Sequence, residues 1–281
     1  MKTAIVFSHY DSNNIVKDYV VFYLRELSKF SENIIFVSTS KLSENETNKV
    51  KQFCKQTIVR ENVGYDFYSY KIGLEYLIPY QQWDEIILCN DSIFAPIFPF
   101  DDLFSKMRKS NCDFWGPTIS YDITPHIQSF FIVFNKRCIE SEVFVNFWNN
   151  LKIINERDNV ITMYELGFSK LLLSHGFICD SFFKVKKWEF YIKTLKALNR
   201  LLWKKLHMRK VSNLLIFFFT ANHKYLRKSN PTFLLWDVLV QSKVPILKKS
   251  LLKMYDEKNQ RNEIINVIKK HSNYNVDMLQ Y

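Results

Sequence analysis

The chain has 281 residues, 47% of them hydrophobic, which is enough to build the core of one large α/β domain or of a domain with an extension. Its five cysteines form no C-x-x-C pair, which argues against a disulfide framework and a zinc site and for a reducing compartment. The formal charge of +11 is uneven: thirteen lysines and arginines but one glutamate lie between residues 181 and 230, so the rest of the chain is nearly neutral.

The chain opens on a short apolar run, Met1 to Phe7, which stops before His9 and Asp11. A run this short predicts a first strand and not a signal peptide. The longest apolar run late in the chain, 214–221, is far shorter than the ~20 residues that a membrane-spanning helix needs. We therefore expect a cytoplasmic protein without a membrane span.

The first half alternates short apolar strands with helices. Predicted strands and helices follow in the order strand 3–7, helix 15–27, strand 33–37, helix 41–55, strand 57–59, a helix that Asp66 or Ser69 could cap and Pro79 ends, and strand 85–89. Such alternation predicts an α/β fold with a mostly parallel, Rossmann-like sheet flanked by helices.

The second half is less regular. The pattern predicts a helix over 101–109, short and long strands over 114–116 and 127–134, helices over 142–151 and 162–174, the basic segment, and an amphipathic helix over 258–281. We expect an α/β domain over residues 1–180, to which the motifs below assign nucleotide-sugar binding and catalysis, and a basic, aromatic-rich helical extension packed on it over residues 181–281.

Polar residues cluster where the predicted strands end. Asn90, Asp91 and Ser92 follow the apolar strand 85–89, and the segment Asn62 to Gly64 follows the preceding strand. Ligands of open α/β sheets bind in the crevice outside the carboxyl ends of the strands. Two polar segments at the ends of strands that face one crevice predict the donor site for a nucleotide-linked substrate. The alternative is that Asp91 satisfies loop amides and that Asn62 and Gly64 form an ordinary turn.

A set of motifs resembles one known family. The matching segments are H-Y-D at 9–11, N-V-G-Y-D-F at 62–67, K-I-G-L at 71–74, W-D-E-I-I-L-C-N-D-S at 83–92, D-F-W-G at 113–116, H-I-Q-S-F-F-I-V-F at 126–134 and N-P-T-F-L-L-W-D at 230–237. Together they are similar to the rhamnan synthesis protein F family. This resemblance implies a GT-A-type glycosyltransferase of bacterial cell-surface polysaccharide assembly, including rhamnose-containing polymers.

A more distant resemblance, to the large inverting GT-A family that includes many rhamnosyltransferases, implies catalytic roles. That family has a D-x-D at the end of a strand, which here reads Cys89-Asn90-Asp91, so only Asp91 matches. By this resemblance Asp91 would hold a divalent cation, Mg²⁺ or Mn²⁺, on the diphosphate. Counting back from Gly176 places Glu165 at that family's base. Glu165 could instead be a first-turn glutamate that complements the helix dipole.

The remaining site residues form a donor set and an acceptor set. The donor set, expected in the crevice, is His9, Asp11, Ser38, Arg60, Asn62, Gly64, Asp66, Lys71, Asn90 and Asp91. Without a metal, Lys71 or Arg60 would offset the phosphate charge. The acceptor set is His126, Gln128, Trp236 and Asp237. The alternatives are a structural His9, the polar face of a strand for His126 and Gln128, and core packing for Trp236.

The basic segment mixes cations with aromatic residues, a composition typical of contact with an anionic membrane surface. We expect it to bring the enzyme to a lipid-linked glycan on the inner face of the cell membrane. A solvated helical face is the alternative, and nucleic acid ranks last because the chain shows none of its binding motifs. The leading hypothesis is a glycosyltransferase; the competitor is a non-catalytic glycan-binding or scaffold protein, which Cys89 in place of the first acid favours.

Overall fold

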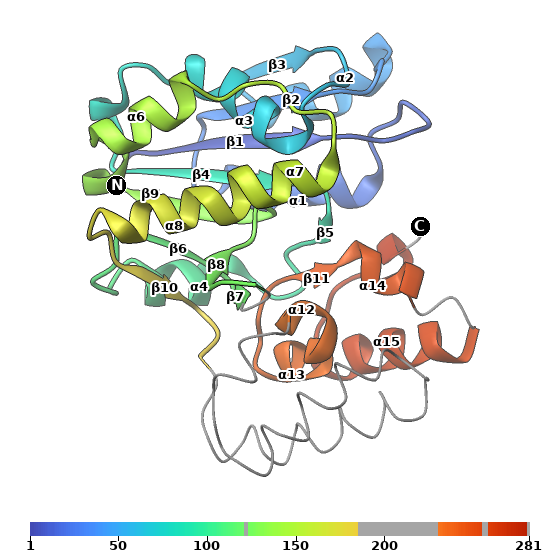
Figure 1. The fold of residues 1–281 in the computed structure, drawn as a ribbon. Coiled ribbons are helices and arrows are strands. Elements are labelled where there is room, and N and C mark those ends of the chain that lie inside the picture. The colour runs from blue at the N-terminus through green and yellow to red at the C-terminus, as the bar shows by residue number, and fades with distance from the viewer. Residues whose placement is uncertain (121–122, 185–229, 255–257, 280–281) are drawn as a thin grey trace.

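The computed structural model describes residues 1–120, 123–184, 230–254 and 258–279 (Figure 1). The basic segment lies outside the described residues from position 185 to 229, so its predicted membrane contact stays a prediction. Within the four described ranges, none of the helices combines the length and the apolar character needed to cross a bilayer.

A seven-stranded sheet forms the centre, in the order β10-β6-β9-β4-β1-β2-β3. Its strands are β1 (Thr3–His9), β2 (Ile34–Ser38), β3 (Gln56–Val59), β4 (Glu85–Asn90), β6 (Phe114–Gly116), β9 (Phe131–Asn135) and β10 (Cys179–Ser181). All neighbours pair in parallel except β9, which is antiparallel to both β4 and β6. The predicted class, a mostly parallel sheet flanked by helices, is confirmed. The predicted domain boundary at residue 180 falls within β10.

Helices cover both faces of the sheet (Figure 1). They are α1 (Asp18–Ser28), α2 (Glu44–Lys51), α3 (Tyr65–Glu75), α4 (Phe100–Met107), α5 (Lys136–Ile139), α6 (Glu142–Asn149), α7 (Arg157–Val160) and α8 (Gly167–Ser174), with the short turns η1 (Tyr80–Gln82) and η2 (Ile161–Leu166). Successive strand residues point to opposite faces, so Ile5 joins one core with α1 and α4, and Val6 joins a second core with α3, α6 and α8.

The C-terminal part packs onto the first of these cores. It comprises α12 (Pro231–Leu234), α13 (Trp236–Gln241), β11 (Leu247–Lys248), α14 (Lys249–Met254), α15 (Lys258–His271) and η3 (Val276–Leu279). Strand β11 pairs antiparallel with β5 (Ile93–Phe94), directly after β4. Leu239 and Ile264 belong to the same buried cluster as Ile5. The described C-terminal elements therefore share a core with the sheet.

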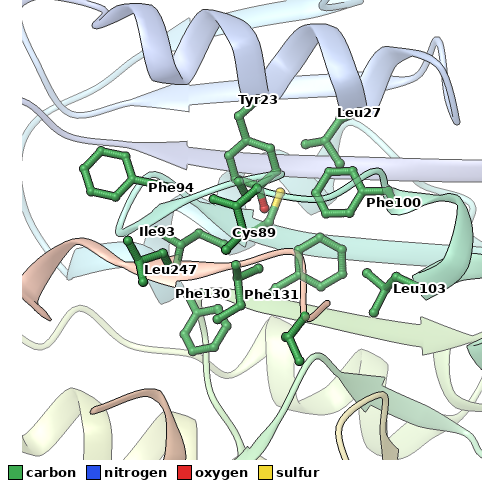
Figure 2. Packing of buried hydrophobic residues seen from close by; sticks show 14 of the residues in the cluster. Tyr23, Leu27, Cys89, Ile93, Phe94, Phe100, Leu103, Phe130, Phe131 and Leu247 are labelled. Carbon is green, nitrogen blue, oxygen red and sulfur yellow. The ribbon is translucent and has the colours of Figure 1, made fainter. Parts of the chain in front are cut away.

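Figure 2 shows this first core around Cys89. Tyr23 of α1 and Phe100 of α4 pack over the cysteine, and Leu247 enters beside Ile93. Cys89 is completely buried, and burial raises the pKa of its thiol. The side chain at position 89 therefore lies in the apolar core and not in the crevice.

One predicted strand and one predicted helix cap are wrong. The strand predicted over 127–134 is divided into β8 (His126–Ile127), which pairs with β7 (Ile119–Ser120), and β9, with a turn between them that is closed by Phe131 N–H donating to the Gln128 carbonyl. A continuous apolar run reports burial and does not report where the backbone turns. The third helix is not capped by Asp66 or Ser69, because it begins at Tyr65 after a left-handed Gly64.

Candidate functional site

Asp66 bridges the carboxyl ends of the two central strands. Its Oδ1 accepts a hydrogen bond of 3.0 Å from Ser8 Oγ on β1, and its Oδ2 accepts one of 2.8 Å from Asn90 Nδ2 on β4. Burial raises the pKa of Asp66 to about 6, and the negative charge of Asp91 adds to the effect. A carboxylate held at the strand ends, with part of its surface accessible, is suited to accept hydroxyl groups of a ligand.

The turn at Gly64 aims Asp66 at the strand ends. Gly64 has φ of +71°, and a Cβ there would lie 2.7 Å from Tyr68 Cβ, so only glycine fits without strain. Helix α3 can therefore start at once, with Asp66 in its first turn. The Gly64 N–H donates to Asn155 Oδ1 at 3.1 Å, and Asn62 is exposed at the rim of the same turn.

The side chains of Arg60 and Lys71 both make contacts to backbone carbonyls of nearby loops. The Arg60 guanidinium spans its own loop, donating to the carbonyls of Glu61, Val63 and Tyr65 and to Ser69 Oγ. Lys71 Nζ donates to the carbonyls of Asn149 and Leu151. Both side chains thus stabilise loops, and the structure does not bring either of them to Asp91.

The ends of β1 and β2 are joined by a buried polar network. His9 Nδ1 and Ser38 Oγ lie 2.9 Å apart. Asp11 N–H donates to Ser40 Oγ at 2.7 Å, and the Asp11 carboxylate lies 3.5 Å from Lys17 Nζ. Burial lowers the pKa of His9, so the imidazole is neutral near pH 7. These predicted donor residues lie at one edge of the sheet, as expected, and their bonds also close the loop after β1.

Two lysines that sequence reasoning missed enter this crevice from β11 and α14. Lys249 Nζ lies 3.1 Å from Asp91 Oδ2 and also contacts the Tyr19 hydroxyl, which itself donates to Asp91 Oδ2 at 3.2 Å. Lys248 Nζ donates to Ser92 Oγ at 3.2 Å. Burial lowers the pKa of Lys248 to about 8, against the opposing charges of nearby carboxylates. A lysine pair after an apolar run carries no signal of its own, because only strand pairing places it here.

Glu165 lies on the other wall, on the π-helical turn η2, a distortion often found at functional sites. Its Oε2 accepts a hydrogen bond of 2.7 Å from Ser129 N–H, and its Oε1 lies 3.5 Å from His126 Nε2. Burial acts to raise the pKa of Glu165, but the bonds from His126 and Ser129 outweigh it, and the pKa lies below its usual value. Gln128 is buried nearby in sequence, and within the described ranges its Oε1 has no hydrogen-bond partner.

The two walls act on each other electrostatically. The charges of Glu165, Asp66 and Asp91 all act on the pKa of Lys248, and Glu165 also acts on that of Asp66. The charges of three carboxylates, from α3, from η2 and from the residue after β4, thus act on one lysine. Carboxylates of this kind can accept hydrogen bonds and a proton from hydroxyl groups.

Comparisons with known proteins assign the chain to a protein family. The family model described as "Rhamnan synthesis protein F" matches residues 34–211, more than half of the chain. The chain belongs to the rhamnan synthesis protein F family. The elements that build the crevice from β2 to η2 lie within the matched residues, whereas Lys248 and Lys249 lie beyond them.

Curated relatives of this family member are longer than the chain itself. It is 28% identical over 155 residues to "Uncharacterized protein y4gN" of Sinorhizobium fredii, an alignment that covers 53% of the chain and 40% of that protein. It is 28% identical over 207 residues to "Virulence protein VirA" of Vibrio anguillarum, covering 71% of the chain and 63% of that protein. The chain thus spans about two fifths of the length of the first relative and under two thirds of the length of the second.

Two solved structures are weakly similar to the chain. One is a cytidylyltransferase from Leptospira borgpetersenii, with a TM-score of 0.38 and 15% identity over 82% of this chain and 98% of that one. Another is S. aureus TarS 1-349, with a TM-score of 0.42 and 13% identity over 96% of this chain and 89% of that one. Likeness at this level carries no argument about activity.

Trp236 and Asp237 are buried in this family member. They lie at the start of α13, with exposed fractions of 1% and 5%, and Trp236 belongs to the first core. The core-packing alternative thus describes the tryptophan ring. Their predicted contact with an acceptor stays a prediction.

Mg²⁺ or Mn²⁺ at Asp91 does not fit the residues around it. The carboxylate oxygen that would bind a cation is paired with the Lys249 ammonium group, and position 89, the other acid of a D-x-D, points into the core. Nowhere in the described part of the chain do three or more His, Cys, Asp or Glu side chains converge as a metal site would require. A divalent cation prefers several oxygen ligands, and at Asp91 it would have to displace the Lys249 ammonium group from Oδ2.

Proposed function

We propose that this chain is a GT-A-type glycosyltransferase of polysaccharide synthesis. It transfers a sugar, with rhamnose as the first candidate, from a nucleotide-sugar donor to a growing cell-surface polysaccharide or a lipid-linked glycan. Family membership supports the pathway, and one observation carries the chemistry: Asp66, Asp91 and Lys248 lie around the carboxyl ends of the central strands, and the charge of Glu165 acts on Asp66 and Lys248. This is where ligands of open α/β sheets bind.

On the donor side, the nucleoside would lie against the ends of β1 and β2. His9, Asp11 and Ser38 line that edge, and the loop from Asn62 to Gly64 would approach the nucleotide through its backbone. Asp66 would accept hydroxyl groups of the ribose or the sugar, since the residue is not fully buried. The diphosphate would then lie over Asn90 and Asp91.

On the acceptor side, Glu165 acts as the base. The oxygen of the acceptor hydroxyl bonds to the anomeric carbon as the bond from that carbon to the diphosphate oxygen breaks, and the hydroxyl proton passes to Glu165 Oε1. Oε1 is the less engaged oxygen, with one neighbour at 3.5 Å. A lowered pKa keeps Glu165 ionised at neutral pH. His126 orients the carboxylate, and Gln128, two residues further along the chain, belongs to the proposed acceptor side.

The test uses a panel of UDP-, GDP-, CMP- and dTDP-linked sugars, nucleotide-linked rhamnose among them. We expect one of them to raise the melting temperature, because a ligand of the folded state stabilises it, and to release its nucleotide on incubation. The Glu165→Gln variant should still bind but release nucleotide about 10²- to 10⁴-fold more slowly. Glu75→Gln, at an exposed position at the end of α3, is the matched control and should keep full activity.

Each outcome separates one hypothesis from the next. Binding without release by the unmodified protein, with polysaccharide acceptors present, would favour the non-catalytic glycan-binding or scaffold alternative. Unchanged release by Glu165→Gln would show that another group takes the proton. A peripheral position at an anionic membrane is part of the same proposal, and vesicles with and without anionic lipid test it through the basic segment.

A further inference from the structure

The crevice receives Lys248 and Lys249 through backbone pairing. Lys248 lies opposite Ile93 in the antiparallel register of β11 and β5, and Lys249 N–H donates to the Ser92 carbonyl at 3.0 Å. Ser92 immediately follows Asp91. The backbone thus holds two consecutive lysines directly beside the acid at the end of β4, although they come from the far end of the chain (Figure 1).

Both ammonium groups are partly buried and still have hydrogen-bond donors to offer. An ammonium group has three hydrogen-bond donors. Lys249 Nζ uses two, on Asp91 Oδ2 and Tyr19 OH, and its side chain is 18% exposed. Lys248 Nζ uses one, on Ser92 Oγ, and lies 4.4 Å from the centre of the Phe130 ring. The pair therefore keeps N–H donors that phosphate oxygens can accept, and hydrogen bonds between charged groups are the strong ones.

Asp91 and Tyr19 hold the Lys249 side chain in position. Both contact the Lys249 ammonium group, and Tyr19 also donates to the Asp91 carboxylate. With one side of Lys249 held in this way, its remaining donor has a set direction. Asp91 then positions a lysine, where the D-x-D resemblance implied a metal ligand.

We propose that Lys248 and Lys249 bind the diphosphate of the nucleotide donor and hold the charge of the departing nucleoside diphosphate, in place of a divalent cation. This inference rests on the proposed function. When the bond from the anomeric carbon to the phosphate oxygen breaks, its electron pair stays on that oxygen, and the two ammonium groups stabilise the resulting negative charge. The proton of the acceptor hydroxyl goes to Glu165, so charge and atoms balance.

The test measures binding of UDP, GDP, CDP and dTDP, and of the matching nucleosides, by isothermal titration in excess EDTA and in Mg²⁺ or Mn²⁺. We expect one diphosphate to bind equally well with and without the metals. Lys248→Gln and Lys249→Gln should each weaken diphosphate binding about tenfold or more, since hydrogen bonds to charged groups are the strong ones. Binding of the nucleoside, which has no phosphate, should stay unchanged.

Two further variants keep the experiment decisive. Lys269→Gln, exposed near the end of α15, is the matched control and should bind as the unmodified protein does. If Lys249→Gln unfolds because Asp91 loses its partner, the double variant Lys249→Gln/Asp91→Asn removes both charges and should fold but bind weakly.

Three results would overturn the inference. The first is binding that requires Mg²⁺ or Mn²⁺, and the second is metal-independent binding that both lysine variants retain. Either would leave the proposed glycosyltransferase standing without its lysine pair. The third, no binding of any diphosphate or nucleotide sugar to the unmodified protein, would remove the proposed function itself.

Discussion

Replacing Asp66 with asparagine tests whether the ionised carboxylate at this position lowers the free energy of unfolding. Asp66 accepts hydrogen bonds from Ser8 Oγ and Asn90 Nδ2, and asparagine can keep both contacts: its Oδ1 accepts from Asn90, and its amide donates to the Ser8 hydroxyl, which rotates freely. The substitution therefore removes one negative charge with little change in shape. It isolates the charge that burial and Asp91 disfavour.

The size of the effect follows from the pKa. Burial raises the pKa of Asp66 from 3.8 to about 6, so the folded protein holds this proton more tightly than the unfolded chain does. The contribution of this bound proton to the free energy of unfolding is fully present below pH 3.8 and is lost as the pH rises through about 6. Above this window the ionised Asp66 costs about 2 to 3 kcal/mol, at roughly 1.4 kcal/mol per pKa unit. Asp66→Asn should therefore stabilise the protein at pH 7.5 by up to that amount.

Urea denaturation at several pH values measures this difference. We expect the advantage of Asp66→Asn to be largest at pH 7.5 and to shrink steadily between pH 6 and pH 4. Asp101→Asn, an exposed aspartate in the first turn of α4, is the matched control and should stay within about 0.5 kcal/mol of the unmodified protein at every pH. Equal stability of Asp66→Asn and the unmodified protein at pH 7.5, or a gain that does not depend on pH, would refute the reasoning. A stabilised variant that binds nucleotide less well would also show why the chain keeps the acid.

Two further predictions concern the scaffold. Arg108→Met should destabilise the fold by about 3 to 5 kcal/mol, because the fully buried Glu85 carboxylate would lose its 2.5 Å ion pair and keep only the hydrogen bond from Thr3 Oγ1. In urea denaturation the Arg108→Met/Glu85→Gln double variant should recover most of this loss. No recovery would show that an unpaired buried charge is not the cause. Gly73→Ala should lower the free energy of unfolding by about 1 to 3 kcal/mol, since the alanine Cβ would lie 2.2 Å from Val6 Cγ1 where α3 packs on β1. An unchanged melting temperature would show that the helix shifts freely to make room.

Much of the first half could be predicted from local pattern. Short apolar runs separated by amphipathic segments specify β1, β2 and β4 because period and burial are local properties of the chain. The position of Asp91 at the end of β4 follows from the same pattern. The family resemblance added Glu165, which the structure places beside His126 and Ser129 in the described fold.

Other residues could be placed only once neighbours were known. The sequence leaves Asp66 open as a donor residue or a helix cap, and the left-handed Gly64 decides its position, because it starts the helix earlier and turns Asp66 toward the strand ends. Arg60 and Lys71 are expected from the sequence to offset the phosphate charge if no metal binds, and the structure shows both donating to nearby carbonyl oxygens. The turn at Gln128 interrupts an apolar run that shows no break in hydrophobicity.

The cationic side of the crevice depends entirely on the tertiary structure. By itself the sequence determined which segments are buried, that the sheet is mostly parallel, and where its acids stand, because each of these depends on residues close together in the chain. Which cations face those acids depends on the pairing of β11 with β5, a contact between distant segments that no local pattern encodes. That pairing, and not the charge-rich segment that dominates the composition, places Lys248 and Lys249 beside Asp91.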